Sequence, residues 1–323
     1  MLSVNDLSIN FGGNVLFSRV DLQFTPGNCY GIIGANGAGK STFIKILSGE
    51  LEPSTGSVTI AAKKRMSVLK QNQNMYDDYT VMDTVIMGNQ RLYDCGREKD
   101  AIYDKPDFDD ADGIRAAELE EEFAELGGWE AESDASRILQ GLGVSPDFHE
   151  TLMHDMDPRL KVKVLLAQAL FGSPDIILLD EPTTGVDAVS RREFWEMLKR
   201  IKESGVTIMV STPYMDEVSR CDRIAMILDG KIIGQGTPAE IVARYPDRLY
   251  SASGENMFEI LGILRHVDGV LNCSSFGSEC HVSVAQDGPD ETVLAKSLED
   301  AGISGCTVKR ISPGIEDCFI RLS

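Results

Sequence analysis

The chain has 323 residues, 42% of them hydrophobic, which is enough for one large domain plus a smaller one with an ordinary globular core. Its 31 basic and 51 acidic residues give a formal net charge of −20, which disfavours direct binding to DNA or to an anionic membrane surface. The 7 cysteines show no C-x-x-C spacing, and no apolar run approaches the roughly 18 residues of a membrane span, so we expect a cytoplasmic protein without a disulfide framework or a zinc site.

The opening of the chain is predicted to be rich in β-strands. Residues 2–7 and 20–24 alternate apolar and polar side chains, as half-buried strands do, and residues 25–28 form a turn before the apolar run 29–33. Directly after this run comes Gly34-Ala35-Asn36-Gly37-Ala38-Gly39-Lys40-Ser41-Thr42, which fits the pattern G-x-x-x-x-G-K-[ST].

This pattern predicts a phosphate cradle. Its glycines let the backbone N–H groups turn inward, and the helix expected from Lys40 points its positive end at the same anion. Lys40 would bridge the β- and γ-phosphates of ATP, and the Ser41 hydroxyl would hold Mg²⁺. A glycine-rich turn without a ligand is the alternative, but the strand before and the helix after it favour a nucleotide site. The candidate nucleotide-binding residues are Gly34, Asn36, Gly37, Gly39, Lys40, Ser41 and Thr42.

An acidic stretch follows, from about Gly88 to Gly128. Its helical periodicity predicts two exposed helices joined by a loop around Pro106, and a solvated helical face is an equally good explanation of the charges. Helical patterns resume at residues 131–142 and 162–171.

A buried strand is predicted over residues 176–179, and it ends in two carboxylates. In P-loop ATPases a carboxylate at this place holds Mg²⁺, which is the role expected for Asp180, and its neighbour Glu181 would orient and deprotonate the attacking water. Two adjacent carboxylates can also simply cap a turn. Their occurrence together with the glycine-rich cradle favours the catalytic role.

The remaining pattern predicts two domains. A helix at 190–202, a strand at 206–211 and a hairpin around Asp229-Gly230 complete an α/β fold with a mainly parallel sheet and an antiparallel β portion over residues 1–245. Residues 246–323 show the order βαββαβ, which predicts a small ferredoxin-like α+β domain. Cys273, Cys280 and His281 can be drawn there as a metal cluster, although cysteines in strands more often pack in a core.

At this point the chain resembles the ATP-binding-cassette (ABC) ATPases. The motifs that carry the resemblance, in the order and approximate spacing of that family, are 34–42 (Walker A), Gln71 (Q-loop), 166–170, 176–181 (Walker B), 182–183 and Asp187 (D-loop). The resemblance implies that Gln71 is a metal ligand and a catalytic residue beside Ser41, Asp180 and Glu181. It also implies that Phe11 stacks on adenine, although a lone phenylalanine more often belongs to a core.

The resemblance changes along the chain. Residues 1–182, including the acidic helical insertion at 88–128, are similar to the first cassette of ABC-F proteins, soluble translation factors whose insertion contacts the ribosome. Residues 183–323 are similar to the ATP-binding subunits of bacterial drug-export ABC transporters. Recombination, a constructed hybrid and a mis-assembled gene are all compatible with this change at Walker B.

Two motifs depart from the family. The signature Leu-Ser-Gly-Gly-Gln, which contacts the γ-phosphate held by the opposite cassette, is replaced by residues 156–160, where Pro158 lacks an N–H group and Asp157 is an anion. Pro213 stands where the family has a switch histidine. We therefore expect slow hydrolysis.

The leading expectation is a nucleotide-binding subunit that hydrolyses ATP with Mg²⁺ and drives export. The partners implied are a second cassette, in a homo- or heterodimer, and a membrane permease that would hold the subunit at the inner face of the cell membrane. The alternatives are a ribosome-associated translation factor of the ABC-F type and a chimeric cassette that binds ATP without a coupled partner.

Overall fold

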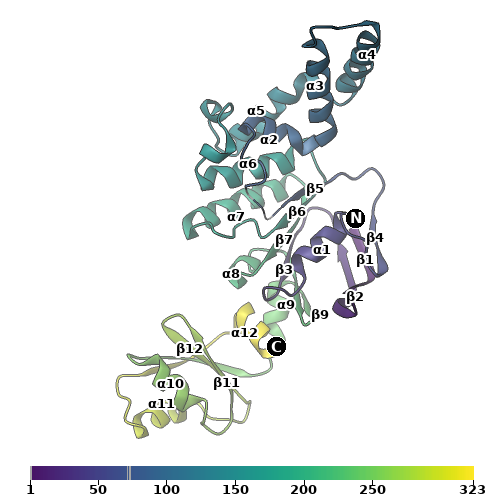
Figure 1. The fold of residues 1–323 in the computed structure, drawn as a ribbon. Helices are drawn as coiled ribbons and strands as arrows, with labels where there is room; N and C mark the ends of the chain where they lie inside the picture. Colours follow the sequence, from purple (N-terminus) through teal and green to yellow (C-terminus); the bar gives the residue numbers. More distant parts are fainter. Residues whose placement is uncertain (1, 71, 73) are drawn as a thin grey trace. The chain divides into compact units, whose positions relative to one another are not determined.

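The computed structural model describes residues 2–70, 72 and 74–323. The chain divides into two compact units, Met1–Gln235 and Gly236–Ser323 (Figure 1). The border lies before the boundary predicted after residue 245. The reason is that helix α9 (Pro238–Ala243) packs against α12 (Ile315–Leu322), the last helix of the second unit.

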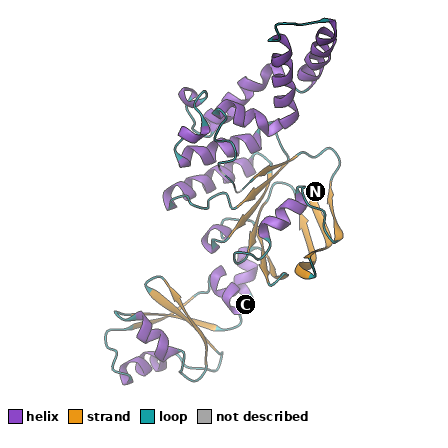
Figure 2. Cartoon of the chain, viewed as in Figure 1, coloured by secondary structure: helices purple, strands orange, loops and turns teal. Residues whose placement is uncertain are grey.

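The first unit is built on a six-stranded sheet in the order β5-β6-β7-β3-β8-β9. Figure 2 draws the strands of the chain in orange and the helices in purple. Its strands are β3 (Cys29–Ile33), β5 (Met66–Leu69), β6 (Ile176–Asp180), β7 (Thr207–Thr212), β8 (Arg223–Leu228) and β9 (Lys231–Gly236). The pairs β5–β6, β6–β7, β3–β7 and β3–β8 are parallel. Strands β3, β6 and β7 are buried throughout, which fits the apolar runs within them, such as residues 176–179 of β6 and 208–210 of β7.

A second, antiparallel sheet has the order β2-β1-β4. It consists of β1 (Leu2–Phe11), β2 (Asn14–Phe24) and β4 (Thr55–Ile60). Helix α1 (Lys40–Leu47) shares one hydrophobic core with strands of both sheets, and the rings of Phe17 and Phe43 meet edge to face in it. The predicted α/β class, with a mainly parallel sheet and a separate antiparallel portion, is confirmed.

Helices make up most of the first unit between β5 and β7. They are α2 (Val81–Ile86), α3 (Gln90–Tyr103), α4 (Asp110–Glu125), α5 (Ala131–Gly141), α6 (Pro158–Leu170) and α7 (Ala188–Glu203), with short 3₁₀ turns at Met87–Asn89, Gly128–Glu130, Pro146–Phe148 and Met153–Asp155. Helix α8 (Met215–Val218) follows β7. Within the acidic stretch, α3 and α4 are the two expected helices, and they pack through Cys95, Ile102, Ala116 and Leu119.

The second unit contains a four-stranded sheet in the order β11-β12-β10-β13, with all neighbours antiparallel. Its elements are β10 (Arg248–Ser253), α10 (Met257–Leu264), β11 (Val270–Phe276), β12 (Glu279–Val284), α11 (Glu291–Asp300) and β13 (Thr307–Ile311). This is the split βαβ arrangement of the predicted ferredoxin-like fold. Cys273 and Cys280 lie in the apolar core of this unit.

Across the described ranges, no helix combines the length and the apolar character needed to cross a bilayer.

Candidate functional site

The glycine-rich loop 34–39 joins the end of strand β3 to helix α1. Gly37 and Gly39 have φ angles of 83° and 97°, which residues with a side chain rarely adopt. At Gly34 an added Cβ would lie 2.5 Å from the backbone oxygen of Ile227. These positions therefore require glycine, and the loop leads directly into the amino end of α1.

Lys40, the first residue of α1, folds its side chain back into the loop. Its Nζ donates to the carbonyl oxygens of Gly34 at 3.0 Å and Ala35 at 3.2 Å, and it forms an ion pair with Oε1 of Glu181 at 3.2 Å. The side chain is 3% exposed. The ammonium group is thus fixed inside the loop that was predicted to hold phosphate.

Asp180 ends strand β6 and connects this strand to the loop. Its Oδ1 accepts hydrogen bonds from the Ser41 hydroxyl at 3.0 Å and from the Ser211 hydroxyl at 2.6 Å. Ser211 lies opposite Asp180 in the parallel register of β6 and β7. Parallel strands end at the same edge of a sheet, so β3, β6 and β7 bring these side chains together.

Glu181 follows Asp180 with a φ angle of 46°, a left-handed conformation that is unfavourable for a glutamate. Its N–H group donates to both the carbonyl and the hydroxyl oxygen of Ser211, each at 3.1 Å. Ser211 therefore holds the Asp180 carboxylate and the Glu181 backbone. No sequence motif points to this serine, because its role depends on β7 lying next to β6.

The other predicted site residues differ in their location and in their exposure to solvent. Gln71 lies outside the described residues, but its neighbours Lys70 and Asn72 line a groove of about 380 Å³ beside Ser41 and Asp180. Phe11 ends β1 and is 51% exposed. Asn36 is exposed in the loop and Thr42 is half-buried in α1. The roles assigned to these residues stay predictions.

The degenerate signature segment begins helix α6. Asp157 caps this helix, and its carboxylate accepts a hydrogen bond from the N–H group of Arg159 at 2.9 Å. The Arg159 guanidinium pairs with Asp187 at 3.2 Å, and Asp187 in turn caps α7. Hydrogen bonds from Ser190 lower the pKa of the Asp187 carboxyl below its usual value, and the charge of Arg159 adds to this effect. These two caps start α6 and α7 earlier than their apolar patterns predicted.

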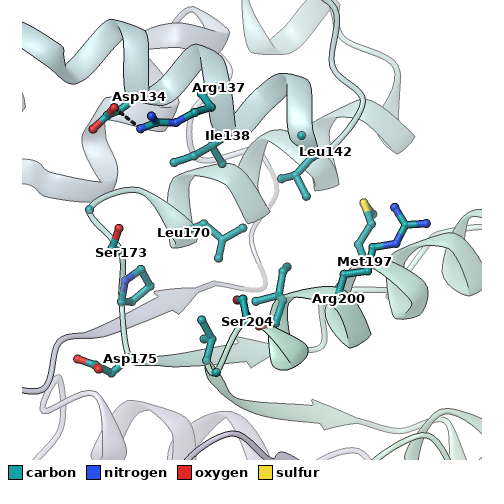
Figure 3. A pocket seen from close by; sticks show the side chains of 16 residues that line it. Asp134, Arg137, Ile138, Leu142, Leu170, Ser173, Asp175, Met197, Arg200 and Ser204 are labelled. Carbon is teal, nitrogen blue, oxygen red and sulfur yellow. Dashed lines mark hydrogen bonds and ion pairs between the residues drawn. The ribbon is translucent and has the colours of Figure 1, made fainter.

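Figure 3 shows a second groove, of about 640 Å³, with the apolar side chains of Ile138, Leu142 and Leu170 along it. It is also lined by the residues just before β6 and β7, such as Asp175 and Ser204. It therefore lies at the amino ends of the parallel strands, whereas the glycine-rich loop follows a carboxyl end. Among the residues that the structure describes, this groove shares no lining residue with the groove beside Ser41 and Asp180.

A glycine-rich loop that presents Lys40 and Ser41 to the carboxylates at the end of another parallel strand of the same sheet defines a P-loop nucleotide-binding fold. A family model described as ABC transporter matches residues 17–184, more than half of the chain, and the chain belongs to this family. The predicted family and the predicted class, a P-loop ATPase cassette, are confirmed.

Three relatives show the range of similarity. An uncharacterized ABC transporter ATP-binding protein, YkpA of Bacillus subtilis, is 53% identical over 232 residues, which is 72% of this chain but 43% of the relative. The Nod factor export ATP-binding protein I of Burkholderia lata is 29% identical over 332 residues, covering 97% of this chain and 93% of the relative. The structure of cbiO1 from Clostridium perfringens, part of the ABC transporter complex cbiONQ, matches with a TM-score of 0.58 at 23% identity, covering 75% of this chain and 90% of that one.

The Bacillus alignment also bears on the predicted change of resemblance at Walker B. Its 232 residues exceed the 182 residues before that point, so the similarity to this relative continues past it. None of the three names refers to the ribosome. The translation-factor and chimera alternatives stay predictions.

Proposed function

We propose that this chain hydrolyses ATP with Mg²⁺ as the nucleotide-binding subunit of an export transporter. The proposal rests on two contacts at one edge of the parallel sheet. Ser41 donates a hydrogen bond to Asp180, and Lys40 forms an ion pair with Glu181. Export is supported by the match to the Nod factor export protein over nearly the full length of both chains.

The side chains at this edge fit a nucleotide phosphate with its metal. The Ser41 hydroxyl and the Asp180 carboxylate are oxygen donors 3.0 Å apart, and oxygen ligands are those that Mg²⁺ prefers. A bound Mg²⁺ would neutralise charge on the phosphates. Gln71 is proposed as a further ligand.

Lys40 and Glu181 have linked roles. The Lys40 ammonium now pairs with Glu181, and phosphate oxygens would compete for the same N–H groups. Once Lys40 turns to phosphate, Glu181 can accept a proton from the attacking water. The binding of the γ-phosphate would therefore separate Glu181 from Lys40 at the moment when the substrate is present.

The partners proposed are a second cassette and a membrane permease at the inner face of the cell membrane. The signature segment supports a heterodimer: Pro158 offers no N–H group and Asp157 already caps its own helix, so a partner with an intact signature would complete the γ-phosphate site. Pro213 directly follows β7 and cannot donate a hydrogen bond to phosphate. We expect slow turnover by the chain alone, and a multi-turnover rate of tens per second for a purified homodimer would contradict this.

Replacement of Lys40 by alanine tests the cradle. Lys40→Ala should weaken the Kd for ATP by about tenfold or more, because a buried charge-assisted contact to phosphate is lost. Titration with a fluorescent ATP analogue measures this, with Lys199→Ala on the exposed face of α7 as the control. A Kd equal to that of the wild type would remove the cradle assignment.

Replacement of Glu181 by glutamine tests the base. Glu181→Gln should lower kcat by about a hundredfold or more without weakening ATP binding, since the phosphate and metal donors remain. A coupled ADP-release assay measures the rate, and the exposed Glu203→Gln at the end of α7 serves as the control. Unchanged hydrolysis by Glu181→Gln would show that another group is the base.

A further inference from the structure

A buried carboxyl group lies behind the site, on the short helix α8. Glu217 is 3% exposed, and both of its carboxyl oxygens accept hydrogen bonds. Oε1 accepts from the Thr183 hydroxyl at 2.7 Å, and Oε2 accepts from the Thr212 hydroxyl at 2.6 Å. A buried carboxyl group needs hydrogen-bond donors, and the two threonine hydroxyls supply them. The side chains of Thr183, Glu217 and Thr212 thus form a hydrogen-bonded bridge.

The two threonines lie close in the chain to the proposed base, Glu181, and to the switch position, Pro213. Thr183 stands two residues after Glu181 and is 1% exposed, while Thr212 ends β7 immediately before Pro213 and is 0% exposed. The bridge therefore ties the loop after β6 to the loop after β7. These are the two loops that carry the proposed base and the switch position.

The hydrogen-bond directions within the bridge are fixed. The Thr212 oxygen accepts a hydrogen bond from the N–H group of Tyr214 at 3.0 Å, so its own proton is directed to Glu217. The Tyr214 ring is in turn held by the Arg191 guanidinium, 4.5 Å from the ring centroid. The segment around Pro213 is thus held on both sides without a histidine.

The loop after β6 needs such support because Glu181 has a left-handed backbone. A conformation of this kind persists only where the surroundings impose it. Ser211 holds the Glu181 N–H group, and the Glu181 carbonyl accepts from Thr184 at 3.2 Å. Thr183 lies inside this turn, and its anchoring by Glu217 fixes the direction in which the chain leaves Glu181.

We propose that Glu217 is a positioning residue for ATP hydrolysis, which acts through Thr183 and Thr212 to hold Glu181 against the γ-phosphate position. The proposal rests on the proposed function, because it takes Glu181 as the base. Glu217 itself touches neither nucleotide nor metal in this assignment. Its removal should therefore affect the rate of the chemical step and leave ATP binding intact.

The test removes one hydroxyl at a time and keeps the shape of the side chain. Thr212→Val and Thr183→Val should each lower kcat by about tenfold, with the Kd for ATP within about twofold of the wild type. Thr212→Ser and Thr183→Ser keep the hydroxyl and should retain activity. Thr84→Val is the matched control, since Thr84 is equally buried but donates to the carbonyl of Thr80 within α2. Glu217→Gln should resemble the valine variants.

Amide hydrogen exchange gives a readout that does not depend on turnover. Exchange of the peptide covering residues 181–186 should be faster in Thr212→Val than in the wild type and in Thr84→Val, because the distant end of the bridge has been cut. Unchanged exchange in that peptide would overturn the proposal. It would also be overturned if Thr212→Ser lost as much activity as Thr212→Val.

The Lys40→Ala protein, assayed beside these variants, separates the two hypotheses. Wild-type hydrolysis no faster than that of Lys40→Ala would contradict the proposed function, and the exchange experiment would still decide whether the bridge holds Glu181. Wild-type hydrolysis that Thr183→Val and Thr212→Val both retain in full would contradict only the positioning role.

Discussion

The two units each bury an aspartate to the same extent, but for different purposes. Asp180 in the first unit and Asp317 in the second are both 6% exposed. Asp180 accepts from Ser41 and Ser211, which come from other elements of the sheet edge. Asp317 accepts from the Gly314 N–H group at 2.7 Å, which caps its own helix α12, and it also contacts His281 of strand β12 at 2.7 Å. Burial of a carboxylate therefore does not identify a functional site, whereas its partners do.

The largest expected effect comes from exchanging these two aspartates for asparagine. Asp180→Asn should lower ATP hydrolysis by about a hundredfold or more, because the carboxylate proposed to hold Mg²⁺ becomes neutral. Asp317→Asn should leave the rate unchanged and cost about 1 kcal/mol of stability through the weakened cap. Steady-state ATPase assays and urea unfolding measure both variants. A loss of activity in Asp317→Asn would show that the second unit takes part in the chemistry.

An intermediate effect is expected from the apolar core of the second unit. Leu294 on α11 is fully buried, and Leu294→Ala should cost about 2–5 kcal/mol in the free energy of unfolding of this unit through the cavity it leaves. The control is Val293→Ala, one residue away and 48% exposed. Thermal unfolding gives the stability, and titration with the ATP analogue should give an unchanged Kd. Weaker ATP binding by Leu294→Ala, but not by Val293→Ala, would show that ATP binding by the first unit depends on the core of the second unit.

The smallest effect is expected at the signature segment. Arg159 and Asp187 form an ion pair, as Lys40 and Glu181 do. The side chains of Arg159 and Asp187 are 65% and 43% exposed, however, and solvent weakens exposed ion pairs. Arg159→Ala should not shift the midpoint of urea unfolding measurably. A clear destabilisation would mean that this pair, rather than the caps alone, holds the starts of α6 and α7 together.

The sequence predicted the parts of the site that are continuous in the chain. The loop 34–42 and the pair Asp180–Glu181 carry their spacing in the sequence, and the order βαββαβ was sufficient for the fold of the second unit. Ser211 and Glu217 could not be found this way. Their contacts depend on which strands are neighbours and on how loops after separate strands meet, and periodicity does not report either.

Apolar periodicity also does not report where a helix begins, which explains why α6 and α7 begin earlier than predicted. Asp157 and Asp187 start α6 and α7 as capping residues before any apolar periodicity begins. A pattern of apolar residues reports the buried face of a helix, but its first turn is defined by hydrogen bonds to side chains.

In the ion pair between Lys40 and Glu181, the Glu181 carboxylate occupies the ammonium group for which the phosphates of ATP would compete. The Lys40 ammonium, which is proposed to hold phosphate, already pairs with Glu181 at 3.2 Å, so part of the intrinsic affinity for ATP would be used to displace a carboxylate of the same chain. The apparent affinity is then the intrinsic one reduced by the fraction of molecules in which the pair is open. If Lys40 has its proposed role, such a site would discriminate against ligands that bring too little negative charge to displace Glu181, and it would favour ATP over nucleotides with fewer phosphates.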